Sequence, residues 1–244
     1  MTSPGRPHHA APPRPQRPQR HVFVARLLLG CGLAGLAVLA GCSGSLLPKP
    51  AAPPARFTLD GADAVARLPA NVPTARRPPT LAAGAPSLVV VVPRAAPGYD
   101  SVRMVYLRRS HELEAFAFHE WVDTPAQMLA PLLVGALQHG AGFRTVLLAP
   151  SAASAGWRLE TELIRLHQDF VTRPSQVRLS LRAVLLDSAT RQPIAWREFD
   201  VSVPAAGDNP VAGVQATHQA VQQVLAAVTA FCAEQLQRTA SARP

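Results

Sequence analysis

The sequence predicts an α+β fold, in which a single domain has a mainly antiparallel sheet and two principal helices packed on one face. Three long segments alternate apolar and polar residues, at 157–169, 176–187 and 194–203, and only short turns separate them. Short connections make such strands antiparallel neighbours. Two further segments carry apolar residues at helical spacing, near 125–140 and 210–237. Each helix has to bury its apolar side, and the sheet is the surface available for this.

Shorter strands are expected around the first helix. Their apolar and β-branched runs lie at 56–60, 87–92, 102–107, 113–121 and 143–148. The run at 87–92 ends at Pro93 and indicates a central strand. Residues 61–86 are rich in proline and alanine, which predicts a loop.

The two helices have recognisable ends and faces. Asp123 and Thr124 are capping residues followed by Pro125 in the first turn, and His139-Gly140 closes the first helix. The last helix carries an apolar stripe of Val214, Val221, Val224, Leu225, Val228 and Phe231. In the middle long strand, Val177, Leu179, Leu181, Ala183 and Leu185 alternate with Arg178, Ser180 and Arg182, so one face is expected to be buried and the other solvated.

The N-terminal segment has the pattern of a bacterial lipoprotein signal. Leu39-Ala40-Gly41-Cys42 forms a lipobox after an apolar run, and the region before that run holds arginines and no acidic residue. We expect export, cleavage before Cys42 and acylation of its thiol. The alternative is an uncleaved membrane anchor over Val22–Gly41, but Arg26 interrupts it. The remaining apolar run, Leu27–Leu39, has the length of the apolar core region of a signal peptide. It is too short for a transmembrane helix, which needs ~20 residues.

This interpretation divides the chain into four parts. Residues 1–41 are the lipoprotein signal peptide, 42–55 a proline-rich tether, 56–239 the folded domain and 240–244 a tail. Removing 41 of 244 residues leaves 203, enough for one domain with a proper core. A proline-rich tether extends by about 3.1 Å per residue, so it reaches roughly 40 Å.

The charge and cysteine content exclude two classes of protein. Five of the 24 basic residues lie in the signal, so 19 basic face 15 acidic residues in the mature chain. No basic run exceeds two residues and none is interleaved with aromatics, so no nucleic-acid partner is expected. Cys31 leaves with the signal and Cys42 takes the lipid, which leaves Cys232 alone. A disulfide scaffold is therefore excluded, and Cys232 is expected to be a small buried hydrophobe.

No catalytic or metal-binding motif is complete. His111-Glu112 and His119-Glu120 begin like a zinc-protease motif, but alanine and aspartate stand where the second histidine is required. No nucleophile elbow or phosphate-binding loop is present. The sequence therefore predicts no catalytic residue, no metal site and no cofactor apart from the covalent lipid on Cys42.

Two sets of residues are candidates for contacts with a partner. Trp121, Trp157 and Trp196 can contact lipid or a partner, although partial burial at the edge of the core is the expectation for each. Arg178, Arg182 and Arg197 fall on the polar sides of neighbouring strands. They form either one basic face for acidic partners or phospholipid headgroups, or a solvated sheet face, and the solvated face is favoured.

Several segments together resemble the ABC-type transport auxiliary lipoproteins. The resemblance lies in the residues 93–100 leading to Arg103-Met104-Val105-Tyr106, and in 113–126 with its aromatic strand and Asp-Thr-Pro helix start. The lipobox, residues 56–60, Phe143-Arg144, 159–163, 168–170, 181–183 and the closing helix also fit in order and spacing. The resemblance covers nearly the whole mature chain.

The resemblance implies an auxiliary component of an intermembrane lipid transporter. The implied partners are an Mce-type periplasmic substrate-binding protein and its ABC permease and ATPase. The implied location is the periplasmic face of the outer membrane, where the lipid anchor holds the protein. Ser43, rather than aspartate, follows Cys42, which favours outer-membrane sorting. Two alternatives remain open: a carrier that holds lipid in a cavity between sheet and helix, and a structural or assembly lipoprotein of the cell envelope.

Overall fold

The computed structural model describes residues 52–59 and 84–242, and within these ranges lie nine strands and two helices. The strands are β1 (Ala55–Phe57), β2 (Leu88–Val90), β3 (Arg94–Ala95), β4 (Arg103–Arg109), β5 (Glu112–Trp121), β6 (Val146–Leu148), β7 (Trp157–Asp169), β8 (Gln176–Asp187) and β9 (Pro193–Pro204). The helices are α3 (Pro125–Gly140) and α4 (Pro210–Ser241).

Strand β7 organises the sheet. One of its edges pairs with β8 along the whole strand, and β8 pairs in the same antiparallel way with β9. Its other edge is covered in succession by β2, β3 and β4, all parallel to it. The three long strands thus confirm the antiparallel sheet, and the chain from β2 to β4 runs once along the opposite edge of β7.

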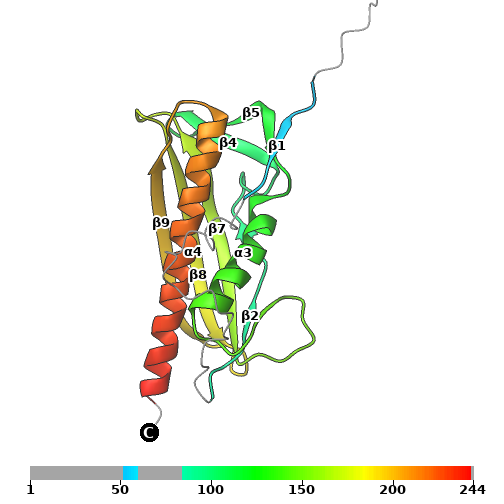
Figure 1. The fold of residues 1–244 in the computed structure, drawn as a ribbon, viewed down its shortest axis with the longest axis vertical. Helices are drawn as coiled ribbons and strands as arrows, with labels where there is room; N and C mark the ends of the chain where they lie inside the picture. The colour runs from blue at the N-terminus through cyan, green and yellow to red at the C-terminus, as the bar shows by residue number, and fades with distance from the viewer. Residues whose placement is uncertain (1–51, 60–83, 243–244) are drawn as a thin grey trace, which may run out of the picture. The chain divides into compact units, whose positions relative to one another are not determined.

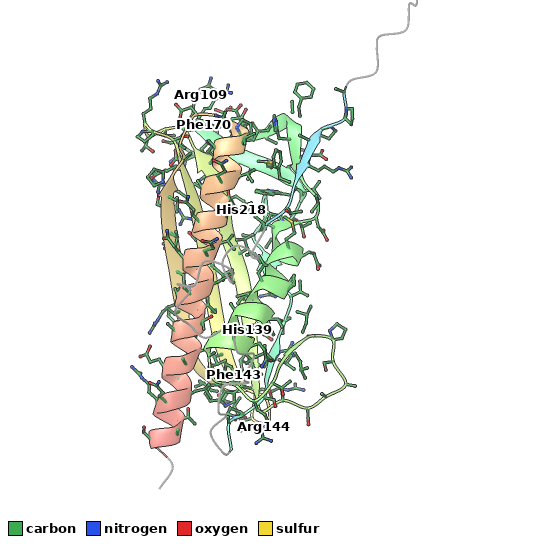
Figure 2. The ribbon with its side chains drawn as sticks, viewed as in Figure 1. Arg109, His139, Phe143, Arg144, Phe170 and His218 are labelled. Carbon is green, nitrogen blue, oxygen red and sulfur yellow. The ribbon has the colours of Figure 1, made fainter. Side chains whose placement is uncertain are left out.

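The outer strands complete a mixed sheet. β4 and β5 form an antiparallel hairpin, β1 pairs with β5, and β6 pairs with β2. The last two pairings are parallel and three residues long, which is too short to leave an alternation pattern in the sequence. The predicted strand at 143–148 is only Val146–Leu148, because Phe143 turns into the core instead. The centre of the Phe143 ring lies 5.7 Å from the centre of the Trp157 ring. Phe143 is labelled in Figure 2.

Both helices cover the same face of the sheet, as predicted (Figure 1). α4 packs on β8 and β9, and α3 packs beside α4. All six residues of the predicted α4 stripe are buried. Thr124 caps α3 by accepting a hydrogen bond from the Gln127 amide, with Pro125 in the first turn. α4 continues to Ser241, four residues beyond the predicted end.

A β-bulge in β7 decides which side chains share a face. The register against β8 shifts between Leu163 and Arg165, which leaves Ile164 as the extra residue. Before the bulge Glu160 and Glu162 point away from the helices, and after it Arg165 and His167 do so, because the extra residue reverses the alternation. Leu163 and Leu166 can therefore both be buried in the core.

Some predictions fall outside the described residues. They concern Cys42, the signal peptide, the tether up to residue 51, and most of the loop at 61–86. In the part of the chain that the structure describes, neither helix combines the length and the apolar character needed to cross a membrane.

Candidate functional site

The face of the sheet opposite the helices is the candidate site, and we call the side chains of β7, β8 and β9 that point from it the open sheet face. They form cross-strand rows, each with one residue from β7, β8 and β9 in that order. The rows are Glu160–Val184–Trp196, Glu162–Arg182–Glu198, Arg165–Ser180–Asp200 and His167–Arg178–Ser202.

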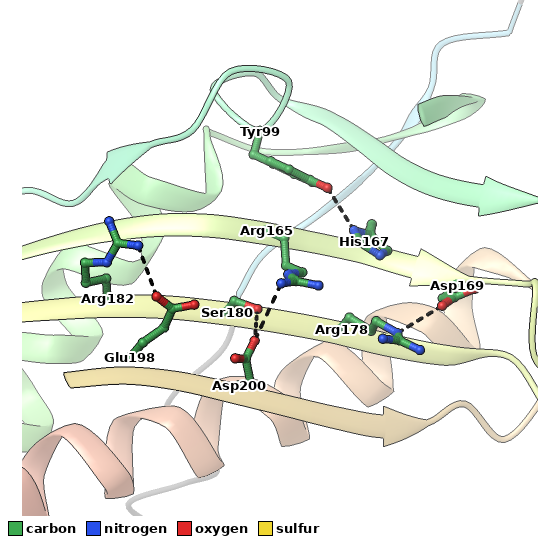
Figure 3. Close-up of polar contacts among 9 residues, drawn as sticks. All are labelled: Tyr99, Arg165, His167, Asp169, Arg178, Ser180, Arg182, Glu198 and Asp200. Atoms are coloured by element: carbon green, nitrogen blue, oxygen red, sulfur yellow. Dashed lines mark hydrogen bonds and ion pairs between the residues drawn. The ribbon is translucent and has the colours of Figure 1, made fainter. Parts of the chain in front are cut away.

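Ion pairs neutralise the charges of this face (Figure 3). Arg182 bridges two strands, with one guanidinium nitrogen 3.1 Å from Glu162 and the other 3.1 Å from Glu198. Arg178 lies 2.9 Å from a carboxylate oxygen of Asp169. The Asp169 side chain is buried, whereas both Arg182 pairs are partly exposed. Partly exposed pairs contribute about 0–1 kcal/mol each to stability, so the Arg182 pairs set the pattern of charge more than the strength of the fold.

In the third row, Arg165 lies 3.9 Å from Asp200, which also accepts a short hydrogen bond from the Ser180 hydroxyl. On this face every arginine of the rows thus has an acidic neighbour. The alternative of a single basic face is therefore wrong, and a solvated face of paired charges is what the structure shows.

Arg197 also corrects that alternative, because it lies on the other side of the sheet. It pairs in register with the buried Ala183, and its guanidinium lies 5.0 Å from the centre of the Phe231 ring on α4. The same guanidinium is 3.1 Å from Glu234. Side chains alternate along β9, so Trp196 and Glu198 point from the open sheet face and Arg197 between them points to the helices.

His167 is a buried polar residue of the open sheet face, as are Ser180 and Asp169. The turn after β3 lays Tyr99 over His167, with the two rings stacked 6.0 Å apart and the Tyr99 hydroxyl 2.9 Å from Nδ1 (Figure 3). Burial lowers the pKa of His167 to about 4, against a smaller opposing effect of the Asp169 charge. The imidazole is therefore neutral at pH 7.

A groove lies beside these rows on the same face. It has a volume of about 1140 Å³ and lies between β2, the loop 149–156 and the turn 187–191. A second hollow of about 290 Å³ continues it along Arg94, Arg182 and Val184. The two hollows share Val91, Val92, Arg158 and Glu160, so they form one open groove along β7.

Local hydrogen bonds hold the walls of the groove. The Asp187 carboxylate accepts bonds from the Thr190 amide at 2.8 Å, the Thr190 hydroxyl at 3.0 Å and the Ala189 amide at 3.0 Å. The bonds from Thr190 are the main reason why the pKa of Asp187 is lowered. The Ser188 amide donates to the Gly156 carbonyl at 2.9 Å and so joins the two walls.

Trp196 is 66% exposed and pairs in register with Val184, which lines the groove. Its expected partial burial is wrong, because the side chain projects from the open sheet face opposite Val184, which neither of the two described helices covers. Trp121 and Trp157 are buried in the core. An exposed tryptophan beside a groove lined by valines and alanines is typical of a surface that binds another protein.

The space between the sheet and the helices is filled. Leu159, Leu179, Leu185, Leu137 and Phe231 each expose 1% or less of their surface. The hollow found there, beside Gly213 and Trp121, has a volume of about 20 Å³, room for about one water molecule. Ligand pockets measure about 300–1,000 Å³. The described core therefore has no room for a lipid chain. The cavity between sheet and helix that a lipid carrier requires is not present among the described residues.

The remaining candidate residues show no site. Among the described residues no cluster of three or more histidine, cysteine or acidic side chains could hold a metal ion. His111 lies in the turn between β4 and β5, and His119 pairs with β1 and stacks on Phe57 at 5.9 Å. Cys232 is fully buried as predicted, and its burial raises the thiol pKa to about 12.

Two features of the site were not predicted from the sequence. The Tyr99–His167 contact joins residues 68 positions apart. The groove forms where β2, the loop 149–156 and the turn 187–191 come together, and these segments are far apart in the sequence. The small side chains of that loop were the one sequence signal for a hollow surface.

The fold and the site define a class of protein: an α+β domain with one helix-covered sheet face and one open sheet face, in which the core formed by the described residues is filled. The chain belongs to the family of ABC-type transport auxiliary lipoprotein components, whose model matches residues 67–229. This membership associates the protein with ABC transport systems and with the cell envelope. A comparison of the sequence with curated proteins finds no match.

Solved structures share the fold. A crystal structure of a DUF330-family protein from Xanthomonas campestris superposes with a TM-score of 0.61 at 22% identity, covering 67% of this chain and 92% of the other. An uncharacterized protein gives a TM-score of 0.55 at 14% identity, with 74% and 99% covered. At these identities the likeness supports the architecture alone.

Proposed function

We propose that this protein is the auxiliary lipoprotein of an ABC-type intermembrane lipid transporter, in which it docks onto an Mce-type periplasmic protein. The family supports the link to ABC transport. The observation that carries the more specific role is the contrast between the two faces of the sheet. Among the described residues the helix-covered face is packed and holds only a hollow of about 20 Å³, whereas the open sheet face presents a groove and Trp196.

The open sheet face is the surface that we propose for the contact with the partner. An interface is usually anchored by a few aromatic and arginine side chains within a rim of polar groups. Trp196 provides the aromatic anchor, and the paired charges of the neighbouring rows provide the rim. Because those charges are already paired, they favour a partner with matched positive and negative groups over a strongly acidic one.

Co-purification tests the role and the surface together. The native lipoprotein is extracted from its own membranes in mild detergent, and co-purifying proteins are identified by mass spectrometry. We expect an Mce-type protein with its permease and ATPase, and we expect Trp196→Ala to reduce their recovery at least tenfold, the loss of about 1.4 kcal/mol.

Leu148→Ala is the matched control, because Leu148 is also an exposed apolar residue but lies on β6 at the other edge of the sheet. Equal recovery with both variants would exclude the open sheet face as the docking surface. Absence of any transporter component from the wild-type preparation would contradict the proposed role itself.

We further propose that Cys42 carries the lipid and that Ser43 directs the protein to the outer membrane. A Cys42→Ala chain should keep its signal peptide or become soluble, because the thiol is the atom that is acylated. Fractionation of the cell envelope with intact-mass analysis measures both. A variant that is processed normally and still fractionates with the outer membrane would contradict the anchor.

A further inference from the structure

Exposed apolar side chains gather at one end of the domain. Seven large apolar residues of the described ranges are exposed, and four of them, Leu113, Phe118, Val171 and Val211, belong to this end. The other three are Val122 after β5, Leu148 on β6 and Trp196 on β9. We call this end of the domain the hairpin end: the β4–β5 turn (109–112), the β7–β8 turn (170–175) and the start of α4 (209–211). The Phe170 amide donates to the Leu107 carbonyl at 2.8 Å and joins the two turns, and Arg109 and Phe170 mark the end in Figure 2.

Aromatic rings and arginines surround a groove at this end. It has a volume of about 550 Å³ and is lined by Phe116, Phe118, Phe170, Arg108 and Arg173 together with the start of α4. The Arg108 guanidinium lies 5.1 Å from the centre of the Tyr106 ring. No carboxylate of a described residue lies within ion-pair distance of Arg108 or Arg173. Asp208 also lines the groove, and its pKa is lowered mainly by hydrogen bonds from Ser175 and less by the charge of Arg173.

The chain enters the folded domain at this end. Ala55 of β1 pairs with His119, which lines the same groove. Farther along, the Thr58 carbonyl accepts a hydrogen bond from His218 Nε2 of α4 at 2.9 Å, which fixes the entering segment on the domain (Figures 1 and 2). Only 12 residues separate Cys42 from Ala55, so a lipid on Cys42 keeps the hairpin end within roughly 40 Å of the bilayer.

We propose that the hairpin end lies against the lipid surface to which the protein is anchored. Apolar side chains mixed with arginines suit the membrane interface, where the apolar groups enter the headgroup region and guanidinium groups pair with lipid phosphates. The tether makes this contact intramolecular, so a weak surface affinity is sufficient. This orientation leaves the open sheet face clear of the membrane for its partner. The inference rests on the proposed lipid anchor.

A fluorescent label tests the orientation in the lipidated protein. Val211→Cys places a thiol at the hairpin end, and Arg144→Cys places one at the opposite end of the domain (Figure 2). Cys42 is blocked by its lipid, and Cys232 is fully buried, so a maleimide dye should react only at the introduced site. Each labelled lipoprotein is bound to vesicles of phosphatidylethanolamine and phosphatidylglycerol that contain a spin-labelled quencher lipid.

We expect several-fold stronger quenching of the label at 211 than of the label at 144. Adding Phe118→Ser and Arg173→Glu to the Val211→Cys chain should reduce the quenching at 211, with an unchanged melting temperature as the control for folding. Equal quenching at both ends, or none at 211, overturns the orientation and leaves the transporter assignment standing. If the intact mass shows no acyl group on Cys42, the anchor fails and this inference fails with it.

Discussion

His167 shows at the scale of one residue how the open sheet face is built. Its imidazole lies in a row of charged side chains, with Arg165, Arg178 and Asp169 nearby, yet the Tyr99 ring excludes water from it. A buried imidazole is disfavoured as a cation, so its pKa of about 4 in the fold compares with 6.5 in the unfolded chain. The unfolded state therefore binds the proton more readily, and stability is lost as the pH falls between these two values.

We predict that His167→Gln removes part of this pH dependence. The wild-type protein should lose up to about 3 kcal/mol of unfolding free energy between pH 6.5 and 4 through this group, since one pKa unit corresponds to about 1.4 kcal/mol. Glutamine stays neutral, so the variant should lose less over the same range. Urea titrations at several pH values measure the difference.

Tyr99→Phe serves as the control, because it removes the hydroxyl and keeps the ring over His167. The pH dependence should persist in this variant, since burial is the main cause of the low pKa. Parallel pH profiles for the wild type and His167→Gln would show that folding does not lower the pKa of this histidine.

Single residues could be predicted from the sequence where the local pattern determines them. Cys232 lies in an apolar helical stretch, and Thr124 precedes a proline at a helix start, so both were placed correctly. Trp196 was not, because its exposure depends on which face of β9 the helices cover. The contacts of Arg178, Arg182 and Arg197 likewise depend on strand register, which the pattern of one strand does not contain.

At the scale of elements, the close approach of α4 to β7 requires a residue without a side chain at position 213. Gly213 in the first turn of α4 lies against the side chain of Gln168, and a methyl group added there would overlap the Gln168 amide. Gln168 cannot move away freely, because it is buried and its Nε2 donates to the Ser175 hydroxyl at 3.0 Å. The glycine thus allows the helix to pack on the sheet.

We predict opposite effects for two glycine-to-alanine changes. Gly213→Ala should lower the unfolding free energy by about 1–3 kcal/mol, the usual cost of overpacking, despite the better helix propensity of alanine. Gly135→Ala in α3 should raise it by up to about 1 kcal/mol, because nothing lies within 4 Å of the added methyl group. Thermal or chemical unfolding measures both. A stabilised Gly213→Ala chain would refute the close approach.

The long elements could be predicted, and the short ones could be predicted only in part. β7 and β8 have the predicted ends and α4 the predicted start, because each carries several periods of its apolar pattern. β3 has two residues, and β6 has three where six were expected. Such strands are defined by their pairing with distant segments. The bulge in β7 was also not predicted, although Leu163 and Leu166 already interrupt strict alternation.

At the scale of the whole molecule, the two faces and one end of the domain have different surfaces. The helices close one sheet face into a packed core, the open sheet face keeps a groove and an exposed tryptophan, and the hairpin end combines exposed apolar groups with arginines. The fold class followed from the order of elements. The filled core could not be predicted, because the space left between the sheet and the helices depends on the distance and angle at which the helices pack on the sheet.

The central claim is that the protein assists lipid transport without holding lipid in its own core. Native mass spectrometry of the mature chain with Cys42→Ser, purified without detergent, tests this directly. The account predicts the mass of the bare polypeptide, because the hollow between sheet and helices has a volume of only about 20 Å³. A phospholipid bound to most of the chains would contradict it and would restore the carrier alternative.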